Sequence, residues 1–113
     1  MKNYMGVVGG RRNAWHQALP ACLTDITRFM KPRLCVLDAT RILTAHGPQG
    51  GRMEDVKTMN KVAASTDIVA LDAFGVEMLG NNPQARQIVE KAAAAGLGNP
   101  GYRKLNPKEM VVS

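Results

Sequence analysis

The clearest pattern in this sequence is an apolar run that passes through a short polar turn into a second, helical apolar segment. Residues 59–64 have the composition of a short buried strand. Ser65, Thr66 and Asp67 follow, and their side-chain oxygens accept hydrogen bonds from the free N–H groups of a helix's first turn. Gly80 suits the position after the last turn, where a positive φ costs glycine little. The pattern predicts a strand, a cap near Asp67 and a helix that ends before Gly80.

Apolar segments on either side of this unit predict the rest of an α/β fold. Asn13 and Asn82 are expected to cap helical regions that begin just after them. Helical segments are predicted at 14–19, 20–30 and 83–95, short strands at 34–39, 42–45 and 110–112, and a strand or loop at 4–10. The chain, residues 1–113, is therefore predicted to be a single α/β domain, with helices packed on a small sheet whose strands are mixed or mostly parallel.

Asp72 is the unusual residue of the central helix because its neighbours are apolar. At about 100° per residue it falls within about 60° of Ile68, Val76 and Leu79, the face expected to pack inward. A carboxylate on such a face needs a cation or hydrogen-bond donors, because unpaired buried charge is costly. Two readings stay open: Asp72 anchors a neighbouring loop, or it belongs to a functional site.

Charge and composition narrow the classes of partner. The formal net charge is +6, but the fifteen Lys and Arg residues form no long run, and aromatic residues make up only 4% of the chain. Nucleic-acid surfaces combine clustered basic residues with stacking aromatics, so a solvated basic surface is favoured and no nucleic-acid partner is expected. Anionic small molecules remain candidate ligands.

The apolar runs and the cysteines favour a cytoplasmic protein with no membrane partner. No secretory signal or membrane-spanning run is visible in the sequence. Cys22 and Cys35 are too few for an iron-sulfur cluster with four thiolate ligands and too far apart for a Cys-x-x-Cys redox pair. We expect both thiols to be reduced.

Polar residues at strand ends and turns form the candidate site. Asp38 closes the apolar strand at 34–39, near the carboxyl end where open α/β sheets bind ligands. The glycine-rich loop at 46–51 follows, and it matches no nucleotide-binding fingerprint. The ligand-binding candidates are Asp38, His46, Gly47, Gly50, Gly51, Ser65, Thr66, Asp67 and Asp72. Because carboxylate oxygens suit hard cations, Asp38, Asp67 and Asp72 are the candidate ligands of a divalent cation such as Mg²⁺ or Ca²⁺.

Several short motifs together resemble a known family. They are Lys2-Asn3-x-Met5-Gly6, Leu37-Asp38-Ala39, Gly47-Pro48-x-Gly50-Gly51, Ala64-Ser65-Thr66-Asp67-x-Val69-Ala70-Leu71-Asp72, Gly80 and Ala94-Ala95-Gly96-Leu97-Gly98. In this order they resemble domain-of-unknown-function family three-sixty-two. The family's domains are longer, and this chain resembles their carboxyl-terminal half.

The resemblance carries its own implications. Members of that family often stand beside, or are fused to, a ferredoxin-like segment with four-iron four-sulfur clusters. It implies a redox-associated setting and a ferredoxin-like partner, with any cluster in a segment absent from this chain. It also implies a homo-oligomer or a missing amino-terminal half, because a half-domain would expose a sheet edge or apolar helix face.

Two functions compete on this evidence. In the first, Asp38, the 46–51 loop and the Ser65–Asp67 turn converge on a small-anion or hard-cation site, catalytic or not. In the second, the chain is a non-catalytic accessory or assembly module of a redox protein, and the polar motifs only hold loops in place. A convergent open pocket favours the first, whereas carboxylates satisfied by backbone N–H donors favour the second.

Overall fold

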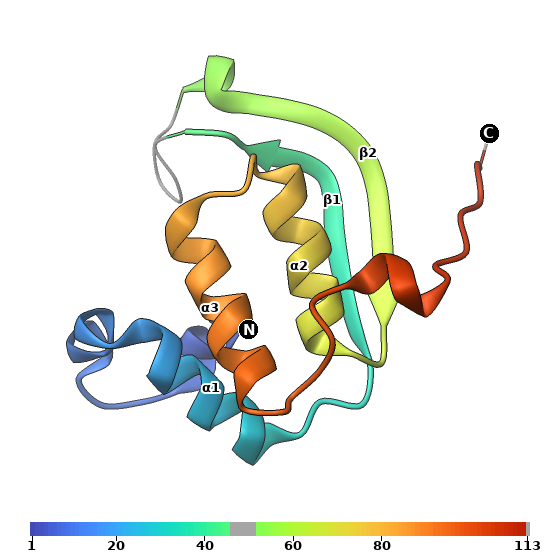
Figure 1. Cartoon of the computed structure of the whole chain (residues 1–113). Helices are drawn as coiled ribbons and strands as arrows, with labels where there is room; N and C mark the ends of the chain where they lie inside the picture. Colours follow the sequence, from blue (N-terminus) through green and yellow to red (C-terminus); the bar gives the residue numbers. More distant parts are fainter. Residues whose placement is uncertain (46–51, 113) are drawn as a thin grey trace.

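The structure is a computed structural model that describes residues 1–45 and 52–112. It is a small α/β fold in which helices pack on a sheet (Figure 1). The elements in chain order are η1 (Lys2–Val7), η2 (Arg12–Gln17), α1 (Leu19–Met30), β1 (Cys35–Leu43), η3 (Met53–Asp55), β2 (Val56–Ser65), α2 (Ile68–Met78), α3 (Pro83–Ala94) and η4 (Tyr102–Leu105), where η denotes a 3-10 helix.

The sheet within the described residues has two strands, β1 and β2, and they run antiparallel. The expected α/β class is therefore confirmed, but the strands are antiparallel and not mixed or mostly parallel as expected. The reason lies in β1, whose apolar composition resembles a strand covered on both faces. In the structure its residues alternate between inward and exposed positions, and Val36 is 65% exposed.

The register of the sheet is interrupted once. Cys35 pairs with Ser65 at one end and Leu43 pairs with Val56 at the other. Between Ala39 and Arg41 the pairing slips, and Asn60 on the opposite strand has a positive φ of 52°. An extra residue in one strand bends a ladder and increases its twist. This irregularity accompanies the curve of the two strands over the helices in Figure 1.

Helix α2 occupies the middle of the molecule. It packs against both strands on one side and against α3 on another, and Figure 1 shows it between them. Its first four residues, 68–71, are all buried. A helix that is apolar around its whole circumference is stable only when neighbours cover most of it. The unbroken apolar run that follows Asp67 is thus explained by this central position.

The hydrophobic core forms where α2 and α3 meet the start of the chain. Its members are Met1, Ile68, Val69, Val76, Val89 and Ala92. Helix α1 adds Leu23, which is fully buried, and packs against α3. Small alanines on α3 let neighbouring helices approach closely. No helix within residues 1–45 and 52–112 is both long enough and apolar enough to cross a membrane.

The structure corrects two expected elements at the ends of the chain. The opening residues, expected as a strand or loop, form η1. Residues 110–112, expected as a strand, are extended but pair with no strand among the described residues, and Val111 is fully exposed. A β-branched composition favours extended backbone, but a strand also requires a hydrogen-bonded neighbour, which a short window of sequence does not specify.

The turn after α3 closes the fold over the start of α2. The backbone N–H of Asn99 donates to Asp67 Oδ2 at 2.9 Å, across 32 positions of sequence. Gly98 lies directly against the same carboxylate. A Cβ added at Gly98 would lie 2.8 Å from Asp67 Cγ and 2.9 Å from Val69 Cβ, closer than real Cβ contacts. Only glycine fits between this turn and α2.

Replacing Gly98 with alanine is therefore expected to lower the free energy of unfolding by about 2 kcal/mol, because the added methyl group displaces either Asp67 or the turn. Urea unfolding followed by circular dichroism measures the change. Gly6→Ala is the matched control, since no heavy atom lies within 4 Å of a Cβ at that position. Equal losses in the two variants would contradict the close packing of the turn.

Candidate functional site

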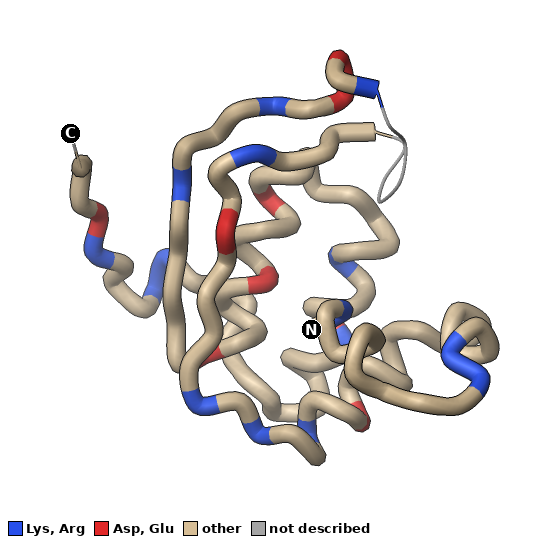
Figure 2. Tube along the Cα trace, turned by 180° about the vertical axis from the view of Figure 1, so that it is seen from behind, with Lys and Arg blue, Asp and Glu red and all other residues tan. Residues whose placement is uncertain are grey.

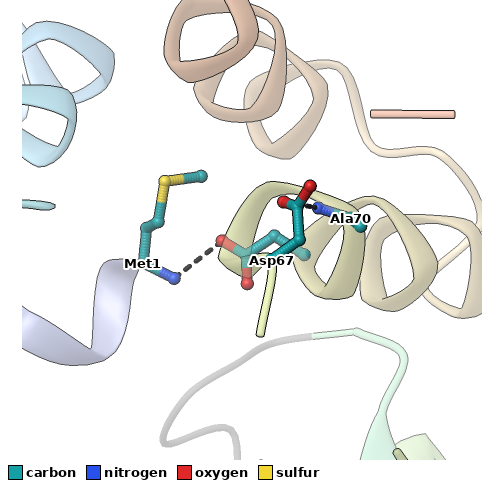
Figure 3. A network of polar contacts seen from close by, with 4 residues as sticks. Met1, Asp67 and Ala70 are labelled. Atoms are coloured by element: carbon teal, nitrogen blue, oxygen red, sulfur yellow. Dashed lines mark hydrogen bonds and ion pairs between the residues drawn. The ribbon is translucent and has the colours of Figure 1, made fainter. Parts of the chain in front are cut away.

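Asp67 lies where the sequence predicts a helix cap, and its contacts are local and long-range hydrogen bonds with the backbone and Ser65. Its Oδ1 accepts from the backbone N–H of Ala70 at 2.9 Å, which confirms Asp67 as the N-cap of α2. Figure 3 shows this contact. Its Oδ2 accepts from Asn99, and its own N–H donates to Ser65 Oγ at 2.9 Å. Both carboxylate oxygens are thus engaged by backbone donors.

Asp38 lies on the outer, exposed face of the sheet rather than in a crevice. Its Oδ1 accepts from the backbone N–H of Thr40 at 2.9 Å and from the Thr40 hydroxyl at 2.6 Å. The hydroxyl hydrogen bond is the main reason that the pKa of Asp38 is lowered, with the Thr40 N–H second. This local turn-like contact occupies Asp38 without help from α2.

Asp72 receives its partner from the other end of the chain. The amino group of Met1 lies 2.7 Å from Asp72 Oδ2, and the Asp72 side chain is 30% exposed. In Figure 3 a dashed line from the nitrogen of the labelled Met1 marks this contact. Two nearby groups feel the same charge. Burial first, and the Asp72 charge to a smaller degree, raise the pKa values of Tyr4 and Cys35.

The described residues do not bring the three carboxylates into one metal-binding group. Within the part of the chain that the structure describes, no cluster of three or more His, Cys, Asp or Glu side chains is arranged to hold a metal ion. Asp38, Asp67 and Asp72 each have a separate partner instead. His46, Gly47, Gly50 and Gly51 lie outside the described residues, and Thr66 is exposed between β2 and α2.

An iron-sulfur cluster does not fit the thiols of this chain. Cys22 on α1 and Cys35 on β1 are both free, half-buried thiols. They are the two cysteines of the sequence, whereas four-iron clusters are held by four thiolates. Burial also raises the pKa of Cys35, which opposes the thiolate form that a metal requires.

The structure adds a groove that the sequence did not predict. It measures about 470 Å³ and lies between α2, α3 and the segment around η4. On its wall Glu77 accepts from the Tyr102 hydroxyl at 2.9 Å and from the Arg103 guanidinium. These hydrogen bonds, Arg103 first, lower the pKa of Glu77. The only signal in the sequence is the turn cluster at 97–101, which shows that the chain reverses but not where it returns.

Comparison with known proteins gives a family and nothing more specific. No curated protein and no solved structure matches the chain. A family model described as Domain of unknown function (DUF362) matches residues 1–77, from the first residue to near the end of α2. The match contains Asp38, Asp67 and Asp72, whereas α3 and η4 lie beyond it. Because the match spans more than half of the sequence, this chain belongs to the DUF362 family.

Proposed function

We propose that this chain is a non-catalytic assembly module of a redox protein, in which the motif carboxylates hold the fold together. The observation that supports the proposal is the environment of Asp67. Both of its oxygens accept from backbone N–H groups, one in α2 and one in the turn after α3. A carboxylate in this setting is an anion held by donors, the reverse of the oxygen cage that surrounds a hard cation.

A second motif carboxylate supports the same reading. Asp38 accepts two hydrogen bonds from Thr40 within β1. Asp38 and Asp67 therefore both have partners in this chain without any ligand. The alternative, a small-anion or hard-cation site that includes Asp38 and Asp67, requires these contacts to give way on binding.

The redox setting rests on the family resemblance, which pairs such domains with ferredoxin-like segments. In this proposal the cluster belongs to such a partner, since the two thiols of this chain do not fit one. The module works in the cytoplasm, where the reducing environment keeps Cys22 and Cys35 as free thiols. No nucleic acid takes part. Figure 2 shows the basic residues spread over separate elements along the trace.

Assembly is proposed to occur through the outer face of the sheet, with a second copy of this chain as the partner. Leu34, Val36 and Val62 are 66%, 65% and 69% exposed. Val36 and Val62 share one face of the sheet, since Val62 pairs with Asp38, two positions from Val36. Their exposure shows that this is the face away from the helices. Exposed apolar side chains on a narrow sheet with open edges are a surface that gains from pairing. The same patch on a second copy supplies the apolar complement.

The role of Asp67 is tested by urea unfolding with and without excess Mg²⁺. Asp67→Ala is expected to lower the free energy of unfolding by about 3 kcal/mol, because it removes a helix cap and leaves the Asn99 N–H without its acceptor. Mg²⁺ is expected to leave the stability of the unmodified protein unchanged. Asp38→Ala is expected to have a smaller effect than Asp67→Ala, since the contact between Asp38 and Thr40 is exposed.

A different outcome would favour the cation site. If Mg²⁺ stabilises the unmodified protein and this gain disappears in both Asp67→Ala and Asp38→Ala, the two carboxylates share a cation and the assembly proposal loses its support. Linkage makes the distinction quantitative, because a bound ligand adds RT ln(1 + [L]/Kd) to the free energy of unfolding.

Self-association is tested by light scattering coupled to size-exclusion chromatography. The unmodified chain is expected to be dimeric, and Val62→Lys is expected to be monomeric, because it replaces an exposed apolar side chain of the proposed interface with a charged one. Val111→Lys is the matched control, since Val111 is fully exposed and lies outside the sheet. A monomeric unmodified chain at high concentration, or dimers that survive Val62→Lys, would show that this face does not join two copies.

A further inference from the structure

The groove between α2, α3 and η4 has an apolar floor. Ala73 and Val76 of α2 and Val89 of α3 line it, and Val76 and Val89 are nearly fully buried. Pro100 and Tyr102 contribute a second wall from the segment that follows the 97–99 turn. The groove has a volume of about 470 Å³, which lies in the range of sites that bind small organic ligands. Such sites are mostly apolar, with a few polar groups that set the orientation of the ligand.

The Tyr102 wall of the groove is held by three contacts. The ring of Tyr102 packs edge-to-face against Phe74, with ring centres 5.4 Å apart and planes at 83°. The guanidinium of Arg103 lies 4.8 Å from the centre of the same ring, and the Tyr102 hydroxyl donates to Glu77. Edge-to-face and cation–π contacts each fix ring orientation. These contacts hold the Tyr102 wall of the groove in the structure without a ligand.

Among the charged residues that line the groove, one cation has no partner among the described residues. Both oxygens of Glu77 are occupied, one by Arg103 and one by Tyr102. Glu90 pairs with Arg86 within α3 at 3.3 Å. The remaining charged residue of the lining is Lys104, and no hydrogen bond or ion pair engages its side chain in the described part of the chain. The rim thus carries three cations against two carboxylates.

The geometry points to a binding site for a small organic monoanion with an apolar body. We propose that the body of the ligand lies against Ala73, Val76 and Val89 while its carboxylate or similar anionic head contacts Lys104. The unused N–H groups of Arg86, which gives one nitrogen to Glu90, lie on the same rim. A negative charge on the ligand gives the exposed ammonium of Lys104 an ion-pair partner, whereas a cation or a neutral ligand gives it none.

This site is independent of the assembly role proposed above. None of its lining residues belongs to the outer face of the sheet, and none is a carboxylate of the sequence motifs. The α3 and η4 walls also lie beyond residues 1–77, the part that matches the family. The groove therefore adds a ligand to this chain without changing the argument about Asp67.

The proposal is tested by titrating the full chain with sodium 2-naphthoate, an aromatic monocarboxylate, and following backbone amide shifts by NMR. Saturable binding is expected below about 5 mM, as is usual for a ligand of this size. The shifts are expected at 73–77, 89 and 101–104. Lys104→Gln is expected to weaken binding about fivefold, since it removes one partly exposed ion pair. The neutral isostere 2-naphthamide is expected to bind the unmodified chain more weakly than naphthoate, by a similar factor.

The matched control is Lys91→Gln, which removes the same charge from α3 at a position outside the groove lining. It is expected to bind naphthoate like the unmodified chain. The proposal is overturned if naphthoate does not saturate, if its shifts map elsewhere, or if the amide binds as tightly as the acid. Equal weakening by Lys91→Gln and Lys104→Gln overturns it as well, because a general charge effect would then explain the binding.

Discussion

The fold depends on the carboxylate of Asp67, which joins the start of α2 to the turn after α3. Asp67 caps α2 through Ala70 and also accepts from Asn99, which lies just beyond α3. Ser65, at the end of β2, accepts from the N–H of Asp67 itself. A strand end, a helix start and a distant turn therefore share one hydrogen-bonded junction. Each of these groups would be costly to bury without a partner, so they stabilise one another.

The central position of α2 follows from the same junction. With its start held by Asp67, the helix runs between the sheet and α3, and its all-round apolar surface is covered on most sides. Asp72 and Glu77 are the carboxylates that this helix carries, and each faces a gap in that cover. Asp72 meets the amino group of Met1, and Glu77 meets Tyr102 and Arg103. Electrostatic contacts thus join Met1 and η4 to α2 beside apolar contacts made by the same segments.

The division of roles between motif residues and groove residues has a physical basis. The motif carboxylates Asp38, Asp67 and Asp72 each accept at least one hydrogen bond from this chain. The groove is different because its floor is apolar and its rim contains an unengaged ammonium group at Lys104. Membership of a family without an assigned reaction does not choose between these surfaces, so the choice rests on the contacts themselves.

The sequence by itself determined the local features, for which a short window contains the whole cause. The α/β class, the caps at Asp67 and Asn82 and the presence of strands on either side of the 46–51 loop all follow from neighbouring residues, because capping geometry and apolar periodicity act over a few positions. The burial of those strands does not follow in the same way, since each exposes one face.

Only the tertiary structure decided which distant groups meet. Three features join residues many positions apart. They are the antiparallel pairing of β1 with β2, the hydrogen bond from Asn99 to Asp67, and the hydrogen bonds from Tyr102 and Arg103 to Glu77. The unpaired state of 110–112 among the described residues has the same origin. These contacts depend on the path of the whole chain, and the free energy of each pairing is shared between segments that no local pattern relates.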